Sequence, residues 1–560
     1  MKKSILFIAC LLLFVSVQAQ SVTEQTKIKE FGLIWGFLKY HHPLLSDGKK
    51  DIDAEFLQHF KQLKDINDRK ELNAFFLKWI LSYGEVSEKV KKPKETYKFE
   101  KNLNLDWIQN EAFNVELQKT LLALRANVKN FKGHYAKLET LTRFVSFNEE
   151  KKLENFSPEN LAHRMLTLFR FWNVINYYDV NKYLADENWN DVLEHSIIQF
   201  LDANTAKSYD KTKTELIASL NDSHTFYIGK AYGLPRFKYK AAFQTTYIND
   251  TLVITKFWNK KLCQQNGVEL GGTITEIEGK TVKEYIKANF GNLYNYANEN
   301  VLMYRTQAVA LYQEDRKEVN IRYTKPNSDQ NASKTIQLFN IMEVDDQKES
   351  IAKQAHYGQK FYEINSKTAY IGLGYLEKKD LGKILKKSSK YEAIIFDLRK
   401  YPKYVDLPKL TKWLYPNRSK FIKVLFPTKV PGLGEYDAEA PLSFVSDPFS
   451  GGRKNKKYYK GKVILLVNKS TISQAEYIAM AIQNSPNCIT IGEQTMGAVM
   501  NITSIPMPEG PEINFTSMGA FYPDGTSVQR KGLKIDYKIS QMASQPERDM
   551  MLEKALKLVD

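Results

Sequence analysis

The chain has 560 residues, of which 43% are hydrophobic and 12% aromatic, and a formal net charge of +17. This length exceeds one hydrophobic core and the composition excludes a disordered chain, so we expect several folded domains. The 81 basic residues are interspersed with 64 acidic ones, which indicates a solvated basic surface and not a nucleic-acid partner. Only three cysteines and no CxxC pair occur, so neither a disulfide framework nor a bound metal or cofactor is expected.

The first 19 residues have the pattern of a secretion signal. Lys2 and Lys3 precede an apolar run from Ile5 to Val15, and Val17-Gln18-Ala19 offers small residues for cleavage. The run is too short for a transmembrane anchor, and no later segment is apolar for long enough. A lipoprotein attached through Cys10 fits less well, because apolar residues continue after it. We therefore expect a periplasmic or extracellular protein without a transmembrane helix.

Residues 20–150 and 151–235 form two stretches with apolar residues at helical spacing. Each contains a tryptophan followed five positions later by a tyrosine and then by a polar segment, at Trp35 and Trp172. The similarity predicts one helix–loop–helix unit used twice, with chance similarity as the alternative. We expect an N-terminal helical domain, then a second helical segment.

Residues 236–340 change to a β pattern. Thr251–Thr255 reads as a strand, and Asn266–Lys280 combines a glycine turn, a short strand and a second turn. This segment resembles the core of a PDZ domain, with Gly272 and Glu278 in place of the usual aspartate and asparagine. The resemblance implies a groove that binds a peptide by its C-terminus as an added strand. A small β domain that serves only as a spacer is the alternative.

Residues 355–560 alternate strand and helix patterns, which predicts an α/β region with a largely parallel sheet. The expected strands are Thr368–Leu373, Ala393–Arg399, Val463–Val467 and Cys488–Gly492. Chemistry in such sheets lies beyond the carboxyl ends of the strands. Ser473 falls there, between the third strand and an expected helix. A serine at such a turn has helix amides beside it, which favours a nucleophile with half an oxyanion hole, although an ordinary helix cap is the alternative.

A serine nucleophile needs a base, and histidine suits this role because its pKa lies near working pH. Among eight histidines, His224 stands out because polar turn residues precede it and a β-branched and aromatic strand follows. A histidine with a purely structural role is the alternative.

Several separated motifs together resemble the C-terminal-processing (tail-specific) serine peptidases, in their tricorn-core-like branch. These motifs are Asp222-Ser223-His224-Thr225, the PDZ-like segment, residues 394–402, Ser473-Gln474-Ala475-Glu476, residues 492–497, residues 522–526 and residues 531–536. The resemblance covers roughly residues 160–550 and implies a multidomain α+β protein with a crotonase/ClpP-like α/β core.

The resemblance also implies roles. Ser473 is the expected nucleophile, His224 the base, and Ser223 a residue that helps to orient the site. The amides of Gln474 and Lys403 are the expected oxyanion donors, although Lys403 replaces a glycine whose backbone angles it does not share. Ala498 stands where many members carry a lysine base, which argues against a Ser–Lys dyad.

The group that should orient the histidine is the main departure from the family pattern. The glutamate expected before the final motif is absent, and Gln529 occupies that region. Gln529 could hold the ring by a hydrogen bond but not by charge, and Asp222, Glu493 or Asp524 could substitute. We expect an exported serine endopeptidase acting on polypeptides. The alternatives are a catalytically impaired peptide-binding scaffold on the same fold and another kind of hydrolase, which the absence of G-x-S-x-G and H-E-x-x-H motifs disfavours.

Overall fold

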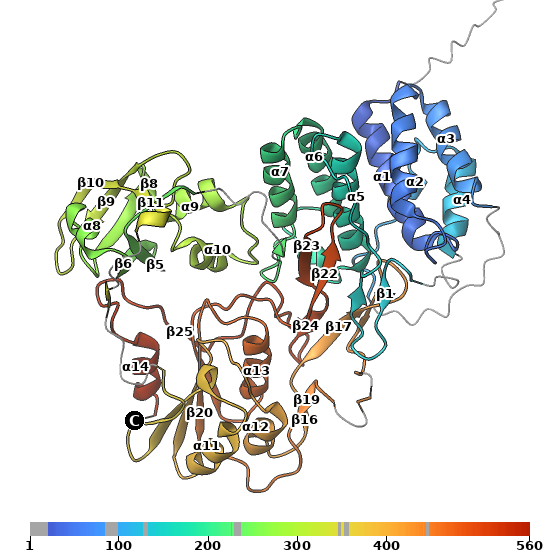
Figure 1. Ribbon diagram of the computed structural model, residues 1–560. Coiled ribbons are helices and arrows are strands. Elements are labelled where there is room, and N and C mark those ends of the chain that lie inside the picture. Colours follow the sequence, from blue (N-terminus) through green and yellow to red (C-terminus); the bar gives the residue numbers. More distant parts are fainter. Residues whose placement is uncertain are drawn as a thin grey trace, which may run out of the picture.

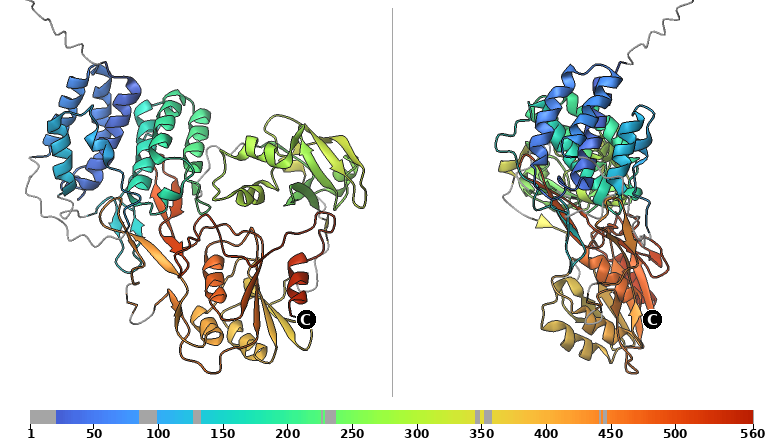
Figure 2. Two further views of the ribbon diagram at one scale, coloured as in Figure 1. Left: turned by 180° about the vertical axis from the view of Figure 1, so that it is seen from behind. Right: turned by 90° about the vertical axis from the view of Figure 1, so that its right-hand side faces the viewer.

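The computed structural model describes residues 21–84, 99–126, 133–225, 227–228, 237–344, 349–351, 358–440, 442–443 and 447–559. The predicted secretion signal, including Cys10, lies outside these residues. The chain forms a helical unit, a β-rich unit and an α/β unit, and the first two lie on the same side of the third (Figures 1 and 2). This confirms the multidomain α+β architecture with a helical N-terminal region. No helix within the described ranges is both long and apolar enough to cross a membrane.

The helical unit contains the predicted repeat. Its first copy is α1 (Glu24–His41), α2 (Ile52–Phe60) and α3 (Arg69–Leu81), and its second is α5 (Leu161–Tyr178), α6 (Trp189–Asp202) and α7 (Ala206–Ala218). Corresponding helices begin 137 residues apart in all three cases, as the starts 24 and 161, 52 and 189, and 69 and 206 show. Each of the six helices begins after a Thr, Asp or Asn side chain that accepts a backbone N–H of the first turn, which stabilises the helix start.

The same tryptophan contact occurs in both copies. Trp35 Nε1 donates to Ile52 O at 2.9 Å, and Trp172 Nε1 donates to Trp189 O at 2.7 Å. Each bond ties the first helix of a copy to the first residue of its second helix. The repeat predicted from these tryptophans is therefore confirmed.

The two copies pack as a pseudo-twofold pair. Helix α1 contacts α6, and α2 contacts α5. A Cβ atom added at Gly32 would lie only 1.8 Å from the ring of Phe169, the residue at the equivalent position of the second copy. One hydrophobic core runs through both copies, so the expected boundary near residue 150 does not separate two cores. The unit also contains the short helices η1 (Lys61–Asp65), η2 (Asp106–Gln109) and η4 (Lys182–Leu184), helix α4 (Val115–Ala126), and strands β1 (Lys137–Leu138) and β2 (Val145–Ser146).

The β-rich unit has a hydrophobic core of its own. Its sheet has the order β10-β9-β7-β6-β12, with β5 on β6 and β8 on β7. The strands are β5 (Phe243–Ile248), β6 (Thr251–Phe257), β7 (Thr273–Ile277), β8 (Lys280–Thr281), β9 (Glu318–Thr324), β10 (Asn331–Gln337) and β12 (Glu349–Ser350), with β4 (Tyr239–Lys240) paired to β11 (Phe339–Asn340). The helices are α8 (Lys260–Gln265), α9 (Val282–Phe290), α10 (Glu299–Thr306) and η5 (Ile341–Glu343). The predicted turn at Glu278 and Gly279 joins β7 to β8 with positive φ at both residues.

The α/β unit is built on a six-stranded sheet of order β13-β14-β15-β20-β21-β25. Its strands are β13 (Tyr362–Glu363), β14 (Thr368–Gly372), β15 (Ala393–Asp397), β20 (Lys462–Val467), β21 (Cys488–Gly492) and β25 (Tyr537–Lys538). Every pair except β13–β14 is parallel, which confirms the predicted sheet. Alternate residues of β15 enter separate cores on the two faces, as strand geometry requires. The helices are η6 (Leu373–Tyr375), α11 (Asp380–Ser388), α12 (Leu407–Leu414), α13 (Gln474–Gln483) and α14 (Met550–Lys557).

Three small antiparallel sheets adjoin the α/β unit. They are β16 (Ser419–Lys420) with β19 (Ser450–Gly451), β18 (Gly434–Tyr436) with β17 (Lys423–Pro427) and β24 (Gly519–Phe521), and β22 (Ile502–Pro506) with β23 (Glu512–Thr516) and β3 (Tyr227–Ile228). The sheets of β17 and β22 also pack against the helical unit. The β22–β23 hairpin rises from the α/β unit to α5 (Figure 2). Arg170 of α5 donates to Pro506 O at 2.8 Å, and four apolar residues of the hairpin join the helical core. This hairpin carries part of the candidate site.

Candidate active site

Ser473 lies between β20 and α13 with a strained backbone. Its φ of 58° and ψ of −122° are uncommon for a residue other than glycine. An ordinary helix cap has extended backbone angles, whereas a strained serine between a strand and a helix is typical of a hydrolase nucleophile. The next residue, Gln474, is the first of α13 and is exposed. Both residues line a cavity of about 670 Å³.

Glu476 fixes the loop that faces Ser473. Its fully buried carboxylate accepts hydrogen bonds from Thr495 Oγ1 at 2.5 Å, Gly497 N at 2.8 Å, Ala498 N at 3.0 Å and Ser473 N at 3.3 Å. Ser473 N also donates to Ala498 O at 2.9 Å. Burial raises the pKa of Glu476 to about 7, against the opposite effect of the four hydrogen bonds. Glu476 therefore joins the start of α13 to the loop around residues 495–498.

Two described positions near Ser473, Ala498 and Lys469, bear on the alternative of a lysine base. Ala498 is fully buried; its backbone N donates to Glu476, and its O accepts from Ser473 N. Lys469, four residues before Ser473, donates to Tyr247 O of the β-rich unit, and burial lowers its pKa against the attraction of Glu493. Its ammonium is thus held at the boundary with the β-rich unit.

His224 is held by a hydroxyl that is in turn held by a carboxylate. His224 Nδ1 lies 3.0 Å from Thr516 Oγ1, at the end of β23, and Thr516 Oγ1 donates to Asp222 Oδ1 at 2.9 Å. Asp222 also accepts from His224 N at 2.9 Å and from Thr516 N at 2.7 Å. The threonine hydroxyl has one proton, and it uses this proton for the hydrogen bond to Asp222. Thr516 therefore accepts from His224 Nδ1, which leaves Nε2 as the unprotonated nitrogen.

The surroundings of His224 favour the neutral ring. The side chain is buried, and this burial lowers its pKa. The charge of Asp222 acts in the opposite direction, and the charge of Arg305 lowers the pKa further. A neutral imidazole with a free Nε2 is the form that can accept a proton.

Ser223 links His224 to the loop that contacts Ser473. Its hydroxyl donates to Met496 O at 2.9 Å and accepts from Ala297 N of the β-rich unit at 2.9 Å. Ser223 thus contacts the loop at Met496, and Ser473 contacts it two residues later, at Ala498. Within the described residues no hydrogen bond joins His224 to Ser473, and catalytic hydrogen bonds are often long before substrate binds.

The structure places the other predicted residues elsewhere. Gln529 is buried, and its Oε1 has no hydrogen-bond partner in the described part of the chain, while Thr516 holds the ring. Asp524 is exposed and pairs with Lys534 at 2.5 Å. Glu493 lines a different cavity together with Lys469. Lys403 is exposed, and the wall of the cavity beside Ser473 contains Tyr401 instead.

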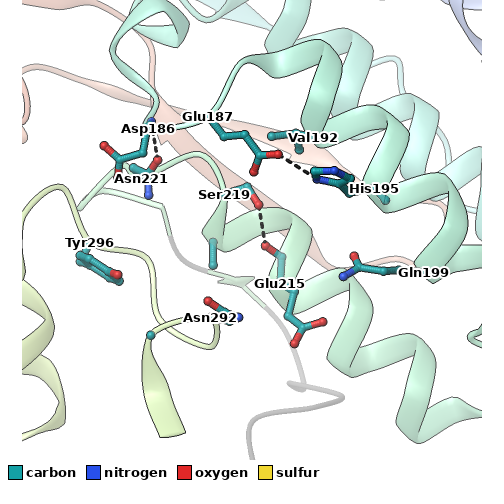
Figure 3. A pocket seen from close by; sticks show the side chains of 13 residues that line it. Asp186, Glu187, Val192, His195, Gln199, Glu215, Ser219, Asn221, Asn292 and Tyr296 are labelled. Carbon is teal, nitrogen blue, oxygen red and sulfur yellow. Dashed lines mark hydrogen bonds and ion pairs between the residues drawn. The ribbon is translucent and has the colours of Figure 1, made fainter. Parts of the chain in front are cut away.

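A further cavity, of about 300 Å³, lies between α6, α7 and the β-rich unit (Figure 3). His195 points to Glu187 there, and His195 Nδ1 lies 2.8 Å from the Glu187 carboxylate on the surface. No group of three or more His, Cys, Asp or Glu side chains suited to a metal ion occurs in the ranges that the structure covers.

Comparison with known proteins finds one matching family model and several similar solved structures. Residues 434–539 match the model of peptidase family S41. Among solved structures, mature CPAF is similar at 11% identity and a TM-score of 0.54, over 71% of this chain and 96% of that chain. Mature CPAF complexed with lactacystin is similar at 11% identity and a TM-score of 0.52, over 71% of this chain and 98% of that chain. The photosystem II D1 C-terminal processing protease has 15% identity and a TM-score of 0.36, over 71% of this chain and 97% of that chain. No curated protein matches the chain. The two CPAF structures establish a shared fold.

Proposed function

We propose that the protein is a serine endopeptidase of family S41, whose model matches residues 434–539, with Ser473 as nucleophile and His224 as general base. The observation that carries this proposal is the strained backbone of Ser473, at the start of α13 and on the wall of a cavity. Strain of this kind persists where the surrounding structure enforces it, and it is typical of active sites.

The relay from Asp222 through Thr516 supports the role of His224. In the proposed reaction His224 Nε2 removes the proton of Ser473 as the serine oxygen attacks the scissile carbonyl carbon. The positive charge that forms on the ring is stabilised by Asp222, since Nδ1–H donates to Thr516 and Thr516 donates to Asp222. A hydroxyl thus stands between imidazole and carboxylate, where many serine peptidases have direct contact.

The start of α13 supplies the proposed oxyanion donor. The first amides of a helix lack intrahelical partners and lie at its positive end. The amide of Gln474 is the first of α13, so we assign it to the oxygen that becomes negative. His224 Nε2–H then protonates the leaving amine. Water then attacks the acyl ester on Ser473 while His224 Nε2 takes a proton from the water. His224 returns this proton to the serine oxygen as the carboxylic acid product leaves.

The β-rich and α/β units fit a protease that binds its polypeptide substrate by the C-terminus. We assign the β-rich unit to a PDZ-like peptide-binding role, with the sheet edge and α9 as the expected groove. The α/β unit would be a crotonase/ClpP-like core. The pattern of the first 19 residues supports export to the periplasm or beyond.

Labelling with a fluorophosphonate tests the nucleophile and the base separately. Wild-type protein should form a covalent adduct at Ser473, Ser473→Ala should form none, and His224→Ala should react far more slowly. Undiminished labelling of Ser473→Ala would overturn the assignment. Absence of labelling in the wild type, together with measurable peptide binding, would favour the scaffold alternative.

A further inference from the structure

The cavity beside Ser473 has an uncharged lining. Ser473 and Gln474 form one wall, and none of the described residues around it is charged. Aromatic and sulfur-containing side chains, among them Phe426, Phe449 and Met518, share this lining with the uncharged polar Thr142 and Asn501. A volume of about 670 Å³ is ample for a large side chain and would leave a small one surrounded by water. Cavities of this composition bind apolar groups.

One wall of this cavity comes from the helical unit. Leu141 and Thr142 lie in the turn between β1 and β2, and both line the cavity beside Ser473. The Leu141 side chain is 68% exposed. Covering an exposed leucine with an apolar ligand is favourable, because apolar surface is removed from water. This turn is the only described part of the first 200 residues that lines the cavity.

The turn is fixed over the α/β unit by its neighbours. Arg143 pairs with Glu435, and its guanidinium lies 4.4 Å from the ring centre of Phe426, itself a lining residue. Thr503 Oγ1 of β22 donates to Val145 O at 2.6 Å. These contacts, at the second and fourth residues after Leu141, hold the turn beside the α/β unit.

We propose that this cavity binds the side chain of the substrate residue whose carbonyl Ser473 attacks, and that it selects large apolar residues, aromatic ones above all. The inference rests on the proposed function. The attacked carbonyl must lie at Ser473 and Gln474, and both line the cavity, so the adjoining side chain enters it. A charged side chain would lose its hydration without gaining a counter-charge. Leu141 closes the cavity over the bound side chain.

Mapping of cleavage sites in a peptide library tests the selectivity. Bonds after Phe, Tyr, Leu or Met should be cut about tenfold to a hundredfold faster than bonds after Asp, Glu or Gly. Peptidyl phosphonates that differ only in the residue next to phosphorus should react with Ser473 at rates that follow the same ranking of residues. Fluorophosphonate labelling of Ser473 without such a preference would overturn this inference and leave the proposed function standing. Absence of labelling would overturn both.

Substitution of Leu141 tests the contribution of the helical unit. Leu141→Asp should lower the preference for aromatic over glycine substrates about tenfold and raise cleavage after Lys or Arg, because the new carboxylate attracts a basic side chain. Leu44 is another exposed leucine of the helical unit, at 39%, and lies outside the lining. Leu44→Asp is therefore the matched control and should keep the wild-type preference. Equal preferences in Leu141→Asp and the wild type would refute the role of Leu141.

Discussion

Thr516 Oγ1 accepts a hydrogen bond from His224 Nδ1 at 3.0 Å, across 292 positions of the sequence. Because this hydroxyl donates its single proton to Asp222, it fixes the histidine tautomer. Thr516→Val keeps the shape of the side chain but removes the acceptor. We expect kcat to fall about a hundredfold or more, as it does when the orienting group of a catalytic histidine is lost.

Thr516→Ser is the control for this substitution. Serine retains the hydroxyl, so most of the activity should return, whereas a role in packing alone would not distinguish Ser from Val in this way. Steady-state kinetics with one peptide substrate would compare both variants with the wild type. A Thr516→Val enzyme with wild-type kcat would exclude the relay.

Asp222 affects both the charge and the stability of the site. Its negative charge raises the pKa of His224 against the stronger lowering by burial. Asp222→Asn should therefore lower that pKa further, so the acidic limb of the kcat/KM profile should move to lower pH while the maximum rate falls. The amide group would also face donors that now bind a carboxylate, which should cost about 1–3 kcal/mol of unfolding free energy. An acidic limb that moves to higher pH would contradict this account.

Glu476 predicts a pH dependence of stability. Burial raises its folded-state pKa from the usual 4.5 to about 7, so the folded protein binds more protons than the unfolded chain between these values. Its contribution to stability should be fully present below pH 4.5 and lost as pH rises through 7. Denaturant unfolding of the wild type and Glu476→Gln across pH 4–8 measures the difference, since glutamine does not titrate. A wild type that gains stability relative to the variant with rising pH would refute the prediction.

Glu476→Gln should also lower stability below about pH 4.5, where the contribution of Glu476 is fully present. Three backbone amides and the Thr495 hydroxyl now donate to the two carboxylate oxygens. Glutamine replaces one oxygen with an NH₂ group that faces donors, at a cost of about 1–3 kcal/mol. Fluorophosphonate labelling should slow in parallel, because the backbone of Ser473 is one of the groups that Glu476 holds. Unchanged stability and labelling would show that the loop is held by other contacts.

The sequence was most informative where the pattern is local. Buried runs such as Val463–Val467 predicted the parallel strands, and the strand–serine–helix order predicted Ser473 beyond the carboxyl end of β20. The orienting group could not be found in this way, because no local pattern marks a threonine at the end of a hairpin strand as the partner of a distant histidine. The sequence suggests Gln529 for this role, with Asp222, Glu493 or Asp524 as substitutes. Of these, Asp222 accepts from Thr516, and Thr516 contacts the ring.

The paired tryptophans of the helical repeat offer a last test, now of the fold. Trp35→Phe and Trp172→Phe each remove one buried bond from an indole to a helix carbonyl. Because the two contacts are equivalent, each change should lower the free energy of unfolding by a similar amount, about 1–3 kcal/mol. Trp107 is the matched control, since its Nε1 has no hydrogen-bond partner among the residues described, and Trp107→Phe should cost less. Urea denaturation of the three variants measures these differences, and a cost confined to one copy would show that the copies stabilise the unit unequally.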